Sequence, residues 1–312
     1  MTDEATFKNL IDRVLACQKL KIKMKSILKS ILNKQQRHDL CLWRDRWASR
    51  VDAFFGSLVN LLPCRLKVFL KAHIQVKKRM DYARVPIFID VSSSMENNVR
   101  TRSCAKEPET ISWIERDFRP GDVMWDIGAN VGAYSLVAAK YFKGKVKVYA
   151  IEPSFLNFSQ LCRNIALNVC GDVVTPLNIA LSEKTCVGRF NYQNFMTGGA
   201  LHSFGEAVDF KNEVFEPVFR QDILSFSIDD LIHIFGLPVP DHIKLDVDGL
   251  ETAIMKGAEK TLSNKKVRSI LVELGDRDVP LVEQLKRHGF VVRERHPAGH
   301  GDLHLFNCIL SR

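Results

Sequence analysis

The stretch DVMWDIGANVGAYSL, residues 122–136, decides the fold of this chain. A short apolar run ends in an acid, Asp126, and a loop that begins with Gly128 and ends with Gly132 follows it. The residues after the loop have the apolar spacing of a helix. A buried strand, a glycine loop and a helix in this order predict the first unit of a parallel sheet, with the loop at the carboxyl end of the strand.

The same alternation of strand and helix patterns continues to the C-terminus. The other predicted strands are 84–93, 145–153, 173–181, 242–249, 267–275, 290–296 and 302–311. The predicted helices are 107–118, 133–142, 157–169, 227–236, 250–264 and 280–289, and residues 188–226 are predicted to be irregular. Strands that alternate with helices of this length predict an α/β fold with a mainly parallel sheet. Ligands of such sheets bind at the carboxyl ends of the strands.

The N-terminal part of the chain differs from the rest in charge. Residues 1–80 contain 18 Lys and Arg against 6 Asp and Glu, whereas the remainder contains 27 against 30. Apolar residues recur there at helical spacing, which predicts two or three helices broken near 56–63. We therefore expect a basic helical segment over 1–83 and an α/β domain over 84–312.

Three roles are open for the basic segment. It is a helical lid with solvated charges, or it attaches to an anionic membrane surface, because basic helices that carry Trp and Phe lie at such interfaces. Contact with nucleic acid ranks last, since no recognised nucleic-acid module accompanies the charge.

Targeting signals and cysteine pairs are missing from the sequence. No apolar run reaches the ~18 residues that a membrane span needs, and the N-terminus lacks the pattern of a signal peptide. The eight cysteines form no C-x-x-C pair and no zinc spacing. The expected location is the cytoplasm, with peripheral attachment to the inner membrane surface left open through the basic segment.

The glycine loop could serve a dinucleotide, but two features oppose that. Its spacing is G-x-x-x-G with Asn130 inside it, rather than G-x-G-x-x-G, and Asp126 would repel a pyrophosphate. A nicotinamide oxidoreductase is therefore disfavoured. A cationic nucleoside removes the objection, because the sulfonium and ammonium of S-adenosylmethionine suit an acid near the loop. Glu152 ends the next predicted strand, where an acid accepts hydrogen bonds from ribose hydroxyls.

The motifs DIGANVG, AIEPS, NIALS and IKLDVDGLETAIMKGAEKTL together resemble the FkbM family of class I S-adenosylmethionine-dependent methyltransferases. The resemblance covers about residues 84–310. It implies a Rossmann-like sheet of seven strands with helices on both faces, and methylation of a hydroxyl on a sugar or other natural product. By motif position it implies these cofactor-binding residues: Asp126, Gly128, Asn130 and Gly132 in the loop, Glu152 at the ribose, Ala180 at the adenine, and Asp246. Asp248 stands where Glu is more usual in the family, so a catalytic role for Asp248 is in doubt.

Methyl transfer to a hydroxyl also needs a group that removes a proton. Our candidates for catalysis are Asp246 and Glu273, at predicted strand ends, and His202, in the irregular segment. Asp246 and Asp248 lie on one side of the strand end, where they could also bind a divalent cation through oxygen, although we assign no metal ligand. Asp248 is predicted to cap the helix that starts at Leu250, and Glu251 suits the first turn of that helix whatever its function.

The sequence therefore predicts an S-adenosylmethionine-dependent methyltransferase that acts on a hydroxyl of a sugar, glycolipid or similar metabolite. Two other functions stay open. One is a non-catalytic scaffold of methyltransferase fold that recruits a membrane or protein through its basic helices. The other is an enzyme that methylates nitrogen or a protein side chain.

Overall fold

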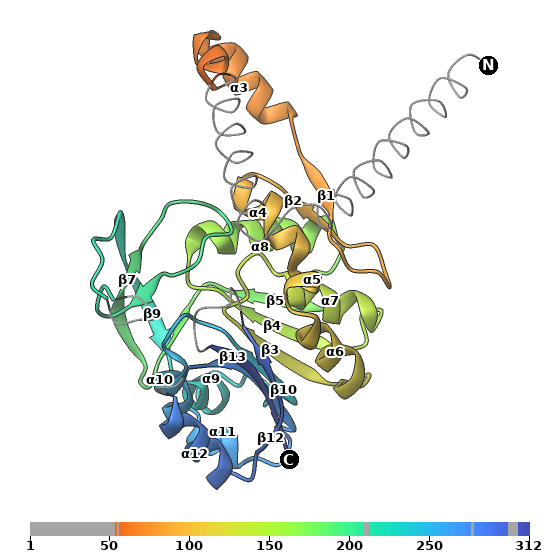
Figure 1. The fold of residues 1–312 in the computed structure, drawn as a ribbon, viewed down its shortest axis with the longest axis vertical. Coiled ribbons are helices and arrows are strands. Elements are labelled where there is room, and N and C mark those ends of the chain that lie inside the picture. The colour runs from red at the N-terminus through yellow and green to blue at the C-terminus, as the bar shows by residue number, and fades with distance from the viewer. Residues whose placement is uncertain (1–53, 55, 209–212, 276–277, 299–304) are drawn as a thin grey trace, which may run out of the picture. The chain divides into compact units, whose positions relative to one another are not determined.

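The computed structural model describes residues 54, 56–208, 213–275, 278–298 and 305–312 (Figure 1). The chain divides into two compact units, 1–74 and 75–312. Residues 75–83 belong to the second unit because β1 (Lys77–Arg79) pairs with β2 (Phe88–Asp90). The helices predicted before residue 54 lie outside the described residues.

The described part of the first unit is helical. Residues 56–61 and α3 (Cys64–His73) are helices, and the chain breaks at Pro63, where the φ angle of −55° suits proline. The sequence placed this break near 56–63, and the helix in fact runs through Gly56. No residue of α3 is buried. Within the described part of the chain, no helix combines the length and the apolar character that a membrane crossing requires.

The second unit is built on a seven-stranded sheet with the order β12-β13-β11-β10-β3-β4-β5. The strands are β3 (Val123–Ile127), β4 (Lys147–Ile151), β5 (Val174–Leu177), β10 (His242–Leu245), β11 (Ser269–Leu274), β12 (Val291–Pro297) and β13 (Phe306–Ser311). The five strands from β11 to β5 pair in parallel. β13 runs antiparallel to both of its neighbours, β11 and β12. The mainly parallel seven-stranded sheet expected from the family resemblance is therefore confirmed.

Helices cover both faces of this sheet (Figure 1). One face packs on α6 (Pro108–Asp117), α7 (Ala133–Tyr141) and α8 (Phe155–Leu167). The other packs on α9 (Ile228–His233), α10 (Glu251–Lys256), α11 (Glu259–Ser263) and α12 (Val279–Arg287). Side chains of β3 alternate between the two cores, since Met124 lies in the first and Trp125 in the second.

The segment predicted to be irregular forms a second, four-stranded sheet of order β6-β9-β7-β8. Its strands are β6 (Ala180–Leu181), β7 (Cys186–Tyr192), β8 (Ser203–Phe204) and β9 (Phe219–Phe226). The prediction over 188–226 was wrong for β7 and β9, because about half of each strand is exposed and neither shows a regular alternation of apolar and polar residues. The predicted strand 173–181 is two strands, β5 and β6, which belong to different sheets.

Three short helical elements connect β2 to α6. They are α4 (Ser94–Asn98), the 3₁₀ turn η1 (Arg100–Arg102) and α5 (Ser103–Lys106). Ser93 and Glu96 form a capping box at the start of α4, in which each side chain accepts a hydrogen bond from the backbone of the other.

Candidate functional site

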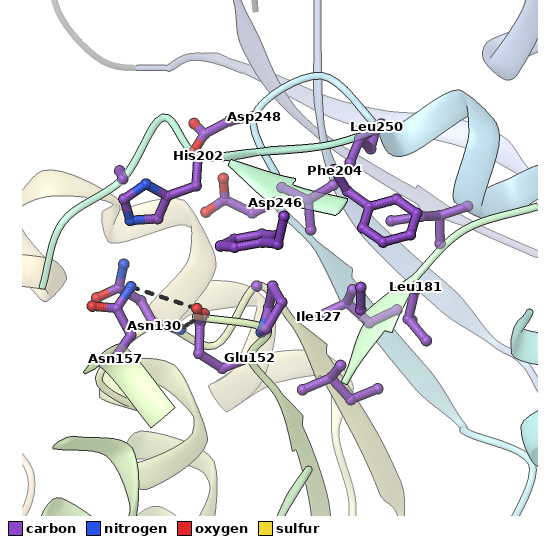
Figure 2. A pocket seen from close by; sticks show the side chains of 18 of the residues that line it. Ile127, Asn130, Glu152, Asn157, Leu181, His202, Phe204, Asp246, Asp248 and Leu250 are labelled. Carbon is purple, nitrogen blue, oxygen red and sulfur yellow. Dashed lines mark hydrogen bonds between the residues drawn. The ribbon is translucent and has the colours of Figure 1, made fainter. Parts of the chain in front are cut away.

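A cavity of about 610 Å³, including its open mouth, lies at the carboxyl ends of β3, β4 and β10. Figure 2 shows its two halves: polar side chains, among them Glu152, Asn130 and His202, stand opposite apolar ones, among them Leu181, Phe204 and Leu250. The cavity therefore suits a ligand that has a polar and an apolar part.

The glycine loop after β3 forms the floor of this cavity. The N–H groups of Gly128 and Ala129 both donate to the Ile151 carbonyl at 3.0 Å, which joins the loop to the end of β4. Gly128 has a φ of +81°, and a Cβ there would lie 1.9 Å from the Asp246 carbonyl oxygen. Only glycine lets the loop approach the end of β10 this closely.

Asp126 lies beneath the loop rather than in the cavity. It is 1% exposed, and Ser135 Oγ donates to its Oδ2 at 2.5 Å. Burial raises the pKa of Asp126, and the Lys244 charge acts in the opposite direction. Gly132 is also absent from the lining, because it packs against Leu161. Both residues were expected at the ligand, and in the structure they hold the start of α7 in place instead.

Glu152 lines the cavity from the end of β4. Its Oε2 accepts from the Asn130 N–H at 2.8 Å and its Oε1 from the Ser154 N–H at 3.0 Å. Burial raises its pKa to about 7. Oε1 also accepts from Asn157 Nδ2 at 3.5 Å, whereas Oε2 accepts only one hydrogen bond from the described residues, so Oε2 is the oxygen with room for ribose hydroxyls. Gly128, Asn130, Ala180 and Asp246 line the same cavity, so five of the seven expected cofactor residues come together.

Asp246 follows β10 and forms an ion pair with Lys244, whose Nζ lies 2.8 Å from Asp246 Oδ2. Burial acts to raise the pKa of Asp246, but the Lys244 ammonium outweighs it and holds this pKa below its ordinary value. Lys244 itself is 1% exposed. The pair therefore places one ionised carboxylate at the edge of the cavity.

Asp248 also lines the cavity, but it does not cap the following helix. α10 begins at Glu251 without a side-chain cap, and Asp248 Oδ2 accepts from the Leu201 N–H at 2.8 Å instead. The capping prediction was wrong because Asp248 adopts a left-handed φ of 58°, which turns its side chain toward the Leu201 segment. The carboxylate of Glu251, in the first turn of α10, instead accepts hydrogen bonds from the Val247 and Gly249 N–H groups that precede the helix.

His202 and Glu273, the other catalytic candidates, occupy different positions. His202 lines the cavity, and burial lowers its pKa to about 4. Its Nε2 is buried and has no hydrogen-bond partner among the described residues. Glu273 is partly buried near the end of β11 and does not line the cavity. Burial, followed by the charges of Asp246 and Asp248, raises its pKa to about 8.

Residues 196–202, here called the strap segment, cross the cavity. The Gly199 carbonyl accepts from Asn130 Nδ2 at 2.8 Å and from Asn157 Nδ2 at 3.1 Å. The Gly198 N–H donates to Asn157 Oδ1 at 2.8 Å. Sequence reasoning missed Asn157. Its position in the first turn of the helix after Glu152 is a signal that could have pointed to it.

The polar and apolar groups of the cavity suit S-adenosylmethionine. Glu152 is a buried carboxylate that can accept a further hydrogen bond, and it faces the apolar half of the cavity, which suits a purine. The glycine loop lines the same cavity beside the carboxylate of Asp246. The buried Asn130 Oδ1 has no partner among the described residues, which leaves an acceptor for a cationic or N–H group. In the same part of the chain, no three His, Cys, Asp or Glu side chains are grouped to hold a metal ion.

A mainly parallel sheet with a cavity at the carboxyl ends of its strands, here called the nucleoside cavity, is the arrangement of Rossmann-like proteins, class I methyltransferases among them. The family model for the "Methyltransferase FkbM domain" matches residues 126–292, so the chain belongs to this family. Its cofactor is S-adenosylmethionine.

Three characterised relatives are similar to the chain. "Hexuronic acid methyltransferase AglP" of Haloferax volcanii is 25% identical over 199 residues, covering 61% of this chain and 75% of the relative. "31-O-demethyl-FK506 methyltransferase FkbM" of Streptomyces tacrolimicus is 28% identical over 206 residues, covering 58% of this chain and 77% of the relative. "Methyltransferase sdnD" of Sordaria araneosa is 26% identical over 168 residues, covering 47% and 64%.

Proposed function

We propose that this methyltransferase transfers the methyl group of S-adenosylmethionine to a hydroxyl of a sugar, glycolipid or similar metabolite. The observation that carries the proposal is the position of Asp246, an ionised carboxylate at the edge of the nucleoside cavity. Two relatives named for a hexuronic acid and for 31-O-demethyl-FK506 support an acceptor of this kind.

Glu152 would hold the ribose, and the apolar half of the cavity around Ala180, Leu181 and Leu250 would hold the adenine. Asn130 and the loop would face the methionine side. When bound, the cofactor supplies a methyl group that its sulfonium has already activated. The protein must then align the acceptor hydroxyl with that carbon, and alignment alone contributes several kcal/mol.

Asp246 would accept a hydrogen bond from the acceptor hydroxyl and orient its oxygen. Lys244 keeps the Asp246 carboxylate ionised, so this contact is available throughout the neutral range. His202 is uncharged at pH 7, and because its Nδ1 accepts from the Gln193 N–H, its open Nε2 carries the proton and offers a hydrogen-bond donor in the cavity. Glu273, whose pKa burial raises to about 8, does not line the cavity, so it could take the proton only through an intervening group and only above that pH. A rising limb of the pH–rate profile near pH 8 that Glu273→Gln abolishes would assign the proton to Glu273.

The basic segment would bring the enzyme to an anionic membrane surface. Among the described residues of this segment, Leu61, Val68 and Phe69 are 81%, 61% and 55% exposed, beside the cations Arg65 and Lys67. Apolar and cationic side chains on exposed helices suit an anionic interface. Co-sedimentation of the full chain with vesicles tests this: equal pelleting with neutral and anionic lipid contradicts it.

The acceptor is tested by transfer of a tritiated methyl group to cell extract that is then separated into lipid, polysaccharide and protein fractions. Label in the polysaccharide or lipid fraction that survives mild alkali, as methyl ethers do, would support the proposal. Label confined to protein would contradict it, and label lost in alkali would indicate methyl esters instead. A Glu152→Ala variant provides the blank for cofactor-dependent transfer.

A further inference from the structure

A second, charged cavity of about 360 Å³ adjoins the nucleoside cavity. The two share the lining residues Gly128, Asn130 and Asp246, so they meet at the glycine loop. Three cationic side chains, of Arg100, Lys106 and Lys244, line the charged cavity together with two carboxylates. Its chemistry is therefore ionic, unlike the apolar half of the first cavity.

Two of the three cations already have carboxylate partners. Lys244 Nζ lies 2.8 Å from Asp246 Oδ2, and Lys106 Nζ lies 2.8 Å from Glu107 Oε1. These pairs account for both carboxylates in the lining. Arg100 is thus the cation in the charged cavity that has no carboxylate partner within the described part of the chain.

Arg100 instead contacts a neutral group. Its Nε and Nη2 donate to the Gly198 carbonyl of the strap segment at 2.9 and 2.8 Å. A guanidinium has five N–H donors arranged to match a carboxylate, and this contact uses only one edge. The η1 turn therefore holds Arg100 between the strap segment and the cavity, with donors left for a ligand.

The backbone adds to the positive potential at this place. Ala133 and Tyr134, the first residues of the nine-residue helix α7, line the charged cavity. The first N–H groups of a helix have no partner within the helix, and they favour an anion. Arg100 and this helix end thus face one cavity from two different elements.

We propose that Arg100 binds a ligand carboxylate in the charged cavity. Two ligands carry such a group: the amino-acid end of the cofactor, and an acceptor of the sugar-acid type. The second source rests on the proposed function, whereas the first needs only the cofactor. In either case Arg100 also joins the ligand to the strap segment through Gly198, so that binding and closure of the cavity are coupled.

Calorimetry on the full chain separates the two sources. One arm compares S-adenosylhomocysteine with 5′-methylthioadenosine, which has the same nucleoside but no amino-acid end. The other arm titrates glucuronate and glucose into protein saturated with S-adenosylhomocysteine, and it needs no turnover. The variant is Arg100→Gln, and the matched control is Arg102→Gln, an exposed arginine on the same turn that does not line the cavity.

If the carboxylate belongs to the cofactor, Arg100→Gln weakens S-adenosylhomocysteine about 10- to 100-fold, as expected for a charged hydrogen bond, and leaves 5′-methylthioadenosine unchanged. If the carboxylate belongs to the acceptor, Arg100→Gln weakens the binding of glucuronate alone. Equal weakening of both nucleosides overturns the proposal, because Arg100 then only supports the strap segment. Unchanged nucleoside affinities without an Arg100-dependent preference for glucuronate over glucose also overturn it. A missing sugar methylation would contradict the proposed function but would not affect the first arm.

Discussion

Lys244 and Asp246 lie two residues apart at the end of β10 and form a 2.8 Å ion pair. The lysine side chain is only 2% exposed, whereas that of Asp246 is 33% exposed. The cation is therefore a fixed internal charge, and the carboxylate is the part of the pair that a ligand can reach. Because Lys244 also faces the buried Asp126 from the neighbouring strand, one cation sets the ionisation of two acids.

Lys244→Met should shift the pH dependence of methyl transfer to higher pH. Without the ammonium, burial alone acts on Asp246 and its pKa rises. The acid limb of the pH–rate profile then moves upward, while the plateau at high pH is less affected. Lys256→Met, which removes an exposed lysine of α10, is the control. An unshifted limb in Lys244→Met would show that Asp246 does not govern the rate.

Glu152 should make cofactor binding depend on pH near neutrality. Its pKa of about 7 in the unliganded protein means that it is largely protonated below pH 7 and must ionise to accept both ribose hydroxyls. The affinity for S-adenosylhomocysteine should therefore fall as the pH falls below 7, by up to about tenfold per unit. Calorimetry at pH 6, 7 and 8 measures this dependence.

The matching substitution is Glu152→Gln, which should remove the pH dependence and weaken binding about 10- to 100-fold. The control Glu183→Gln makes the same change at an exposed glutamate and should alter neither the affinity for S-adenosylhomocysteine nor its pH dependence. A normal affinity in Glu152→Gln would place the ribose elsewhere.

The unliganded protein should become more stable as the pH falls from about 8.5 to 6.5. Burial raises the pKa of Glu152 and Glu251 to about 7, and that of Glu273 to about 8. A raised pKa gives stability that is complete below the unfolded value and is lost as the pH rises through the folded value. Below pH 6.5 the trend should weaken, because the buried His202 and His242, with pKa values lowered to about 4, oppose folding as the pH falls.

Thermal melting in the absence of ligand measures this dependence. Saturating S-adenosylhomocysteine should flatten it, because ribose hydroxyls favour the ionised Glu152. A melting temperature that rises between pH 6.5 and 8.5 would contradict the assignment of these raised pKa values.

Gly128→Ala should destabilise the protein far more than Gly121→Ala. Both glycines have positive φ, +81° and +98°, so alanine is strained at either place by about 1–3 kcal/mol. At Gly121 the added Cβ meets nothing within 4 Å, but at Gly128 it lies 1.9 Å from the Asp246 carbonyl oxygen. We expect the Gly128 substitution to cost at least about 2 kcal/mol more. Denaturant unfolding of both variants is the measurement, and equal losses would show that the loop can move away from β10.

The sheet was predictable from the sequence because its signals are local. Strands such as Val123–Ile127 are short, largely apolar runs bounded by turns, and helical spacing follows many of them. The second sheet was not predictable in this way. Its strand Cys186–Tyr192 is mostly exposed in its first half, and it is stabilised by pairing with Phe219–Phe226, far along the chain.

The site was predictable in part. The sequence shows which acids stand at the ends of predicted strands, and two of them, Glu152 and Asp246, do line the cavity. Asp126 has the same pattern and is sealed beneath the loop, because the side-chain direction at a strand end depends on the helix that packs there. Arg100 gave no pattern of its own, since its contact with the strap segment joins residues that are distant in sequence.

The sequence by itself determined that this chain is a strand–loop–helix protein with a glycine loop and an acid after each of its first strands. The spacing of apolar residues and the presence of turn-forming residues are local properties, so the sequence alone shows them. Only the tertiary structure decided which acids meet a ligand, that residues 196–202 cross the cavity, and that Arg100 lacks a carboxylate partner in the described chain. The physical reason is that burial and long-range hydrogen bonds exist only after distant segments have packed together.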